Sequence, residues 1–230
     1  MQNSTRRAWI QAAGVSAVTL NGVVWAADKK EAEVTANEDL MREHGVIRRA
    51  LLVYQECAGR LRKNAGAVDA AVLHQTAQLF RAFGEEYHEK KLEEAYIFPA
   101  VRKVGGRAAT YPDILVAQHN RGREITSYIL AVTNAGKVAT ANAEPLAQAM
   151  EGLVRMYENH AAREDTIVFP AWKKTMNEKQ YDEIGDKFED IEHQTFGTDG
   201  FEDAEARISK IEGTLGLEDL SQFTPPPPKQ

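Results

Sequence analysis

The apolar side chains near the start of the chain recur at alternating intervals of four and three residues, and this spacing constrains the fold more than any other feature. The series begins at Leu40 and includes a histidine, His44. Such spacing places one apolar face along an amphipathic helix, which must be buried against other helices. The series comprises Leu40, His44, Ile47, Leu51, Tyr54, Ala58 and Leu61.

Further helical patterns follow, and no segment has a convincing strand pattern. Helices of about 24 residues are about 36 Å long, a length typical of an up-down-up-down four-helix bundle. Pro99 and Pro170 are each expected to end a helix. We therefore predict an all-α fold with a four-helix bundle. Besides the first helix, the bundle helices are expected at about residues 68–99, 112–134 and 144–170, with breaks at 63–66, 105–106 and 134–142.

The C-terminal part of the chain reads as an addition to this bundle. A helix is expected from about Asn177, where an Asn-x-x-Gln sequence favours a capped start, and another over residues 201–213. A run of four prolines near the end predicts an extended tail. We therefore divide the chain after its leader into a bundle at residues 37–175 and a C-terminal helical extension with a Pro-rich tail at residues 176–230.

The first 27 residues have a different composition from the rest. They contain Arg6 and Arg7, no acidic residue, and then a modestly apolar run. This pattern resembles a twin-arginine export signal, with cleavage expected near Ala26 or Ala27. It predicts a soluble mature protein in the periplasm; the alternative is an N-terminal membrane anchor.

Composition narrows the chemistry that the bundle can carry. The 230 residues have a formal net charge of −6, which disfavours sequence-independent binding of nucleic acid. There is a single cysteine, Cys57, which excludes an intramolecular disulfide and metal sites built on several thiolates. Cys57 is interpreted as a small buried apolar residue. Any bound metal must therefore take histidine and carboxylate ligands.

Four of the six histidines fall one to each bundle helix, each on the apolar face. Buried imidazoles and carboxylates without a shared partner would cost about 1–3 kcal/mol for each unsatisfied group, and a metal centre removes that cost. His74 lies too far along its helix to join the same centre. His193 lies outside the bundle helices and is expected to be a surface or structural residue. The candidate ligands are His44, His88, His119 and His160.

Two carboxylates extend this set. Glu164 follows His160 by four residues and therefore lies on the same helix face. Glu93 follows His88 by five residues, so one extra residue must be absorbed, for example in a π-bulge. Whether Glu93 or the neighbouring Glu94 is the ligand is left open. Aligning the repeated Phe-Pro pairs of EEAYIFPAV and EDTIVFPAW places Glu93 opposite Glu164.

The segments EHGVIRRAL, YHEKKLEEAYIFP, QHNRGRE and NHAAREDTIVFP together resemble the hemerythrin-like (HHE cation-binding) family over residues 37–175. The resemblance implies a bundle around two non-haem iron ions, bridged by the two carboxylates and completed by the histidines. Manganese or zinc would suit the same ligands. Oxygen-carrying members have a second histidine four residues after the one on the third helix; here that residue is Arg123, expected to be an ion-pair partner.

Two classes of function follow from these observations. In the first, the protein binds or senses oxygen or another small diatomic ligand, or handles iron. In the second, it is an enzyme that reduces peroxide or nitric oxide or repairs iron centres. The sequence has no dinucleotide fingerprint, haem motif or cysteine cluster, so an enzyme would need an electron-transfer partner, and a binding protein is favoured. A metal-free helical interaction module is a third alternative.

Overall fold

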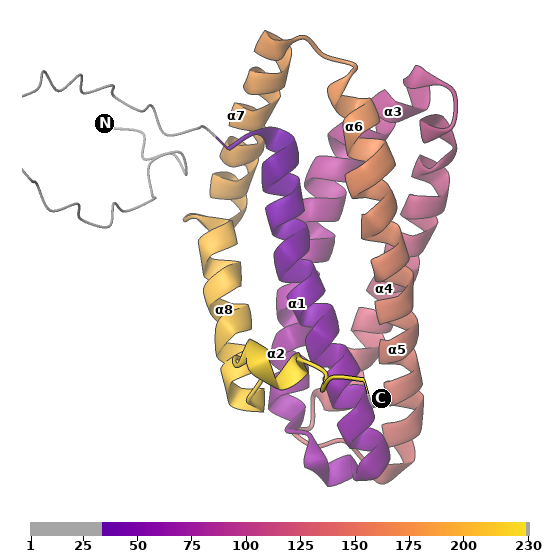
Figure 1. Ribbon diagram of the computed structural model, residues 1–230, viewed down its shortest axis with the longest axis vertical. Coiled ribbons are helices and arrows are strands. Elements are labelled where there is room, and N and C mark those ends of the chain that lie inside the picture. The colour runs from indigo at the N-terminus through magenta and orange to yellow at the C-terminus, as the bar shows by residue number, and fades with distance from the viewer. Residues whose placement is uncertain (1–33, 229–230) are drawn as a thin grey trace, which may run out of the picture.

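The computed structural model describes residues 34–228, and their regular structure is entirely helical. The predicted export signal lies outside the described residues. Four long helical columns pack side by side, which confirms the predicted all-α bundle (Figure 1). They are α1 (Ala36–Lys63); α2 (Ala70–Leu79) continued by η3 (Phe80–Ile97) and α3 (Phe98–Val104); α4 (Pro112–Thr133); and α5 (Thr140–Arg163) continued by η5 (Glu164–Val168) and α6 (Phe169–Lys173).

The C-terminal helices stand one above the other beside α1 (Figure 1). They are α7 (Glu178–Phe196) and α8 (Gly200–Leu215). Their apolar faces join the same hydrophobic core as the bundle helices. Short 3-10 turns complete the described structure at η2 (Ala65–Ala67), η4 (Ala108–Thr110) and η6 (Leu220–Phe223).

Helix ends follow local chemistry that is visible in the sequence. The predicted start of α7 is confirmed: the Asn177 side chain accepts the Gln180 backbone N–H, and the Gln180 side chain accepts the Asn177 backbone N–H. The column that ends with α3 stops at Gly105 and Gly106, whose φ values of 76° and 63° favour glycine.

The expectation that two prolines end their helices is wrong. Pro99 and Pro170 instead lie at the start of α3 and α6, where the missing N–H is tolerated. Each proline follows a π-helical turn, and the residue before it, Phe98 or Phe169, donates its backbone N–H to a carbonyl five residues earlier. The wider turn lets the helix continue past the proline.

The core is filled by aliphatic and aromatic side chains from all the columns. Cys57 is fully buried there as a free thiol, which confirms its interpretation as a small apolar residue. Burial raises the pKa of this thiol to about 12. Within residues 34–228, no helix combines the length and hydropathy that a membrane span requires.

Candidate metal centre

All six predicted ligands converge inside the bundle. The helical columns contribute side chains at a common depth: one from α1, two from η3, one from α4, one from α5 and one from the first residue of η5. None of the six is more than 3% exposed. They are His44, His88, Glu93, His119, His160 and Glu164.

One half of the centre is the His119/His160 pair. The Nε2 atoms of these two imidazoles lie 3.1 Å apart, and their ring centroids lie 4.8 Å apart. Glu93 Oε2 is 3.3 Å from His119 Nε2, and Glu164 Oε1 is 3.0 Å from His160 Nε2. Two imidazole nitrogens and one oxygen from each glutamate therefore face one point.

The other half is the His44/His88 pair, whose ring centroids are 4.7 Å apart. Here Glu93 Oε1 is 3.4 Å from His88 Nε2, and Glu164 Oε2 is 3.5 Å from His44 Nε2. Each glutamate thus directs one oxygen to each histidine pair. This is the arrangement of two carboxylates shared between two adjacent cation positions.

The hydrogen bonds of the imidazoles orient them for ligation. In each ring, Nδ1 faces an oxygen acceptor away from the centre, so Nδ1 carries the proton and Nε2 presents its lone pair inward. The acceptors are Asp165 Oδ1 at 2.7 Å for His44, Glu43 Oε2 at 2.6 Å for His88, Glu94 Oε1 at 2.9 Å for His119, and Gln118 Oε1 at 2.9 Å for His160.

Several inward-facing atoms would be satisfied by a cation. His88 Nε2 and all four carboxylate oxygens of Glu93 and Glu164 are buried, and none forms a hydrogen bond within the described part of the chain. Burying such groups unsatisfied costs about 1–3 kcal/mol each. Nitrogen and carboxylate donors suit iron, manganese or zinc. The residues present therefore fit a pair of bound metal ions.

The close approach of imidazoles and carboxylates in the cluster shifts the pKa values of both kinds of group. Burial alone lowers the pKa of His119, but the carboxylates of Glu89, Glu93 and Glu94 outweigh it and raise the pKa to about 10. Burial alone would raise the pKa of the Glu93 carboxyl, yet His88 and His119 hold it well below its usual range. A cation that binds here must displace protons from imidazole, so its affinity falls at low pH.

The extra residue between His88 and Glu93 is accommodated by π-helical backbone, which confirms the predicted π geometry. Five-residue spacing then brings both side chains to the same face. Glu93, rather than Glu94, reaches the centre. Glu94 Oε1 instead accepts the His119 Nδ1 proton and a 2.5 Å hydrogen bond from Arg123.

Three residues that were expected not to ligate the metal, Arg123, His74 and His193, lie outside the ligand cluster. Arg123 pairs with Glu94 and, at 3.1 Å, with Glu89, which confirms its expected role as an ion-pair partner. His74 lies within hydrogen-bond distance of the Thr133 hydroxyl, at 3.0 Å, away from the centre. His193 lies on α7 and is not part of the ligand cluster.

The hydrogen-bond partners of the imidazoles cannot be assigned from the sequence alone. Tyr87 and Tyr157, which precede or lie near a histidine in the chain, donate to the carboxylates of Glu43 and Glu89 rather than to an imidazole. Each imidazole partner is the chain neighbour of one ligand and contacts a histidine on a different element: Glu43 precedes His44 but bonds His88, and Asp165 follows Glu164 but bonds His44.

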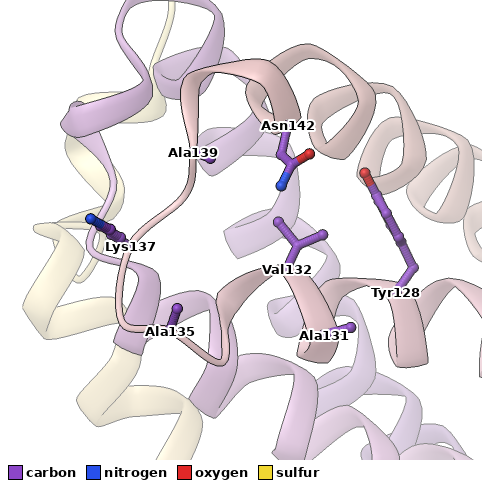
Figure 2. A pocket seen from close by; sticks show the side chains of 7 residues that line it. All are labelled: Tyr128, Ala131, Val132, Ala135, Lys137, Ala139 and Asn142. Carbon is purple, nitrogen blue, oxygen red and sulfur yellow. The ribbon is translucent and has the colours of Figure 1, made fainter.

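A surface hollow of about 410 Å³ lies at the junction of α4 and α5, around their connecting loop (Figure 2). It shares no residue with the histidine cluster and has no histidine or carboxylate in its lining. It is therefore not part of the candidate metal centre. Its lining residues are Tyr128, Ala131, Val132, Ala135, Lys137, Ala139 and Asn142.

A helical bundle that encloses four imidazoles and two shared carboxylates defines a metal-binding protein. Comparison with known families supports this class. The family model of the hemerythrin HHE cation binding domain matches residues 35–172 and residues 110–222 of the chain. The chain belongs to this family.

Two relatives of this chain occur in mycobacteria. The uncharacterized protein Rv1995 of Mycobacterium tuberculosis (strain H37Rv) and the uncharacterized protein Mb2018 of Mycobacterium bovis are each 43% identical to the chain over 198 residues. The matched region covers 86% of this chain and 76% of each relative. No solved structure gave a significant match.

Proposed function

We propose that this protein holds two non-haem iron ions and uses them to bind or sense oxygen or another small diatomic ligand. The observation that carries the proposal is the placement of Glu93 and Glu164, each of which directs one oxygen to the His44/His88 pair and the other to the His119/His160 pair. Manganese or zinc could occupy the same donors. Iron is favoured because its oxidation state can change when a small ligand binds.

Four imidazole nitrogens and two oxygens from each glutamate would supply four donor atoms to each ion, which leaves coordination positions of a six-coordinate iron open to a small ligand. Arg123 occupies the position at which oxygen carriers of this family have a further histidine. Its guanidinium donates hydrogen bonds to Glu89 and Glu94 and offers no atom that could ligate a metal ion. The surroundings are buried, so a small neutral diatomic molecule can enter more readily than a charged substrate.

The second candidate function is enzymatic reduction of peroxide or nitric oxide, or repair of iron centres. It is favoured by a buried polar chain beside the His119/His160 pair: the Tyr157 hydroxyl donates to Glu89 Oε1 at 2.5 Å, and Glu89 pairs with Arg123. Such groups can hold and deliver protons. Turnover would also need an external electron-transfer partner.

Rapid mixing separates the two functions. The iron-loaded, reduced protein is mixed with oxygen while its visible absorption is recorded, and the oxygen is then removed. We expect a band that forms with oxygen and disappears on its removal. Irreversible oxidation, with steady consumption of added peroxide in the presence of a reductant, would contradict the binding function and support the enzyme.

We also propose that the protein is exported to the periplasm, which rests on the sequence of residues 1–27 alone. Cell fractionation tests it. Replacing Arg6 and Arg7 by lysine should trap a longer precursor in the cytoplasm, and an unchanged distribution would contradict export by this route.

A further inference from the structure

The two halves of the candidate centre differ in the groups that support their imidazoles. Both histidines of the His44/His88 pair donate Nδ1–H to a carboxylate: His88 to Glu43 at 2.6 Å and His44 to Asp165 at 2.7 Å. The other oxygen of Glu43 accepts a 2.9 Å hydrogen bond from the Tyr87 hydroxyl, which holds the carboxylate in place.

The His119/His160 pair has weaker support. His160 donates to the neutral amide oxygen of Gln118 at 2.9 Å. His119 donates to Glu94 Oε1, but the same oxygen accepts a 2.5 Å hydrogen bond from Arg123, whose side chain is only 13% exposed. The Asp165 carboxylate behind His44 is likewise paired with a guanidinium, that of Arg48. The carboxylates behind His44 and His119 are therefore matched, and the two pairs differ in the acceptors behind His88 and His160.

This difference affects how strongly each pair donates to a cation. A carboxylate that accepts the Nδ1 proton makes Nε2 of the same ring more basic, and removing such a partner lowers metal affinity by about 10–100-fold. An amide acceptor orients the ring but contributes no net charge. The His44/His88 pair is thus the stronger donor, although both pairs share Glu93 and Glu164.

We infer that the two metal positions are unequal: the His44/His88 pair holds its ion tightly, whereas the His119/His160 pair holds the exchangeable ion. This inference rests on the proposed two-metal function. The asymmetry originates in the acceptors behind the other two rings, which are the Glu43 carboxylate for His88 and the neutral Gln118 amide for His160. Metal loading should therefore begin at His44 and His88, and loss should begin at His119 and His160.

Titration of the chelator-treated full chain with Co²⁺, followed by visible absorption and calorimetry, tests the inference. Two binding steps alone decide nothing, because two cations that share carboxylates repel each other. The variants make the assignment. Gln118→Glu places a carboxylate behind His160 and should tighten the weaker step by about tenfold or more, with the tighter step unchanged. Glu43→Gln should weaken the tighter step by about 10–100-fold.

Gln55→Glu is the matched control, because it adds the same charge at an exposed position on α1, about 16 Å along the helix from His44. It should alter neither step. Circular dichroism confirms that each variant is folded, and Glu43→Gln keeps the inference testable if Gln118→Glu does not fold. The inference is overturned if Gln118→Glu changes the tighter step, or if both variants act on the same step. Fewer than two Co²⁺ bound per chain would instead contradict the two-metal function itself.

Discussion

Gly122 on α4 is the residue whose small size most directly shapes the surroundings of the centre. A Cβ at this position would overlap the Tyr157 hydroxyl and lie 3.0 Å from ring carbons Cε2 and Cζ. The Tyr157 ring cannot easily move, because it packs edge-on against Phe80 at 5.1 Å and beside His160 at 5.3 Å. Gly122 therefore lets Tyr157 reach Glu89.

Alanine substitution at two glycines should have opposite effects on stability. Gly122→Ala should lower the free energy of unfolding by about 1–2 kcal/mol, because overpacking costs more than the gain in helix propensity. Gly152→Ala, at an exposed helical position with nothing within 4 Å of the added Cβ, should raise it by up to about 1 kcal/mol. Urea unfolding of the metal-free proteins measures both, and equal stabilisation by the two changes would contradict the packing described.

Among the helical elements, η3 and η5 each carry one of the two glutamates of the cluster, Glu93 near the end of η3 and Glu164 as the first residue of η5. Glu93 O accepts the Phe98 N–H, and Glu164 O accepts the Phe169 N–H, each from five residues along the chain. The wider turn admits the following proline. Before Glu93 the π geometry also absorbs the additional residue after His88, whereas His160 and Glu164 keep ordinary helical spacing.

Deleting one residue should therefore have different consequences in the two helices. Removing the exposed Lys90 gives four-residue spacing between His88 and the present Glu93, so the segment can become α-helical and retain both metal ions. Removing the exposed Glu158 from α5 rotates His160 by about 100° relative to the preceding helix and should abolish metal binding at its pair. Metal analysis of the two purified variants decides: equal loss in both would show that the π segment has no such tolerance.

Sequence periodicity was sufficient to predict the bundle and to select the four histidines and Glu164, because a side chain on an apolar helix face must point into the core. The choice between Glu93 and Glu94 stayed open, since neither lies four residues after His88. The extra residue after His88 also predicted the π geometry there. The second π turn was not predicted, since the spacing of His160 and Glu164 is normal and only the following Phe169-Pro170 pair requires it.

The imidazole partners were not assignable from sequence for a related reason. Neighbouring residues on a helix point about 100° apart, so a ligand's neighbour faces an adjacent helix. Which histidine it meets there depends on how the helices are packed. Glu43 therefore supports His88, and Gln118 supports His160, rather than the ligand next to each in the chain.

At the scale of the whole molecule, the C-terminal helices share the core of the bundle. Ile208 on α8 is fully buried, and Arg49 on α1 forms hydrogen bonds with Glu205, Ser209 and Glu212 along the same helix. Trp172 on α6 stacks on Phe188 of α7 with ring centroids 5.6 Å apart. Because of these contacts, we expect the bundle and the extension to unfold together.

Ile208→Ala should reduce the free energy of unfolding by about 2–5 kcal/mol while leaving a single transition. Leu220→Ala, in which the side chain removed is 80% exposed, should change it by less than about 0.5 kcal/mol. In protein that lacks residues 1–27, Trp172 is the one tryptophan, and urea curves followed by circular dichroism and by its fluorescence should coincide. An early transition confined to one probe in Ile208→Ala would mean that α8 unfolds independently.

Elemental analysis of metal per chain, on protein purified from iron-replete cells, tests whether the four histidines and two glutamates hold a pair of metal ions. We predict two iron ions per chain in the wild-type protein and in His74→Ala, whose side chain lies away from the centre. We predict a large loss from both positions in Glu164→Ala, because Glu164 serves both histidine pairs. A wild-type preparation without bound transition metal, or a Glu164→Ala preparation that retains both ions, would contradict the two-metal centre.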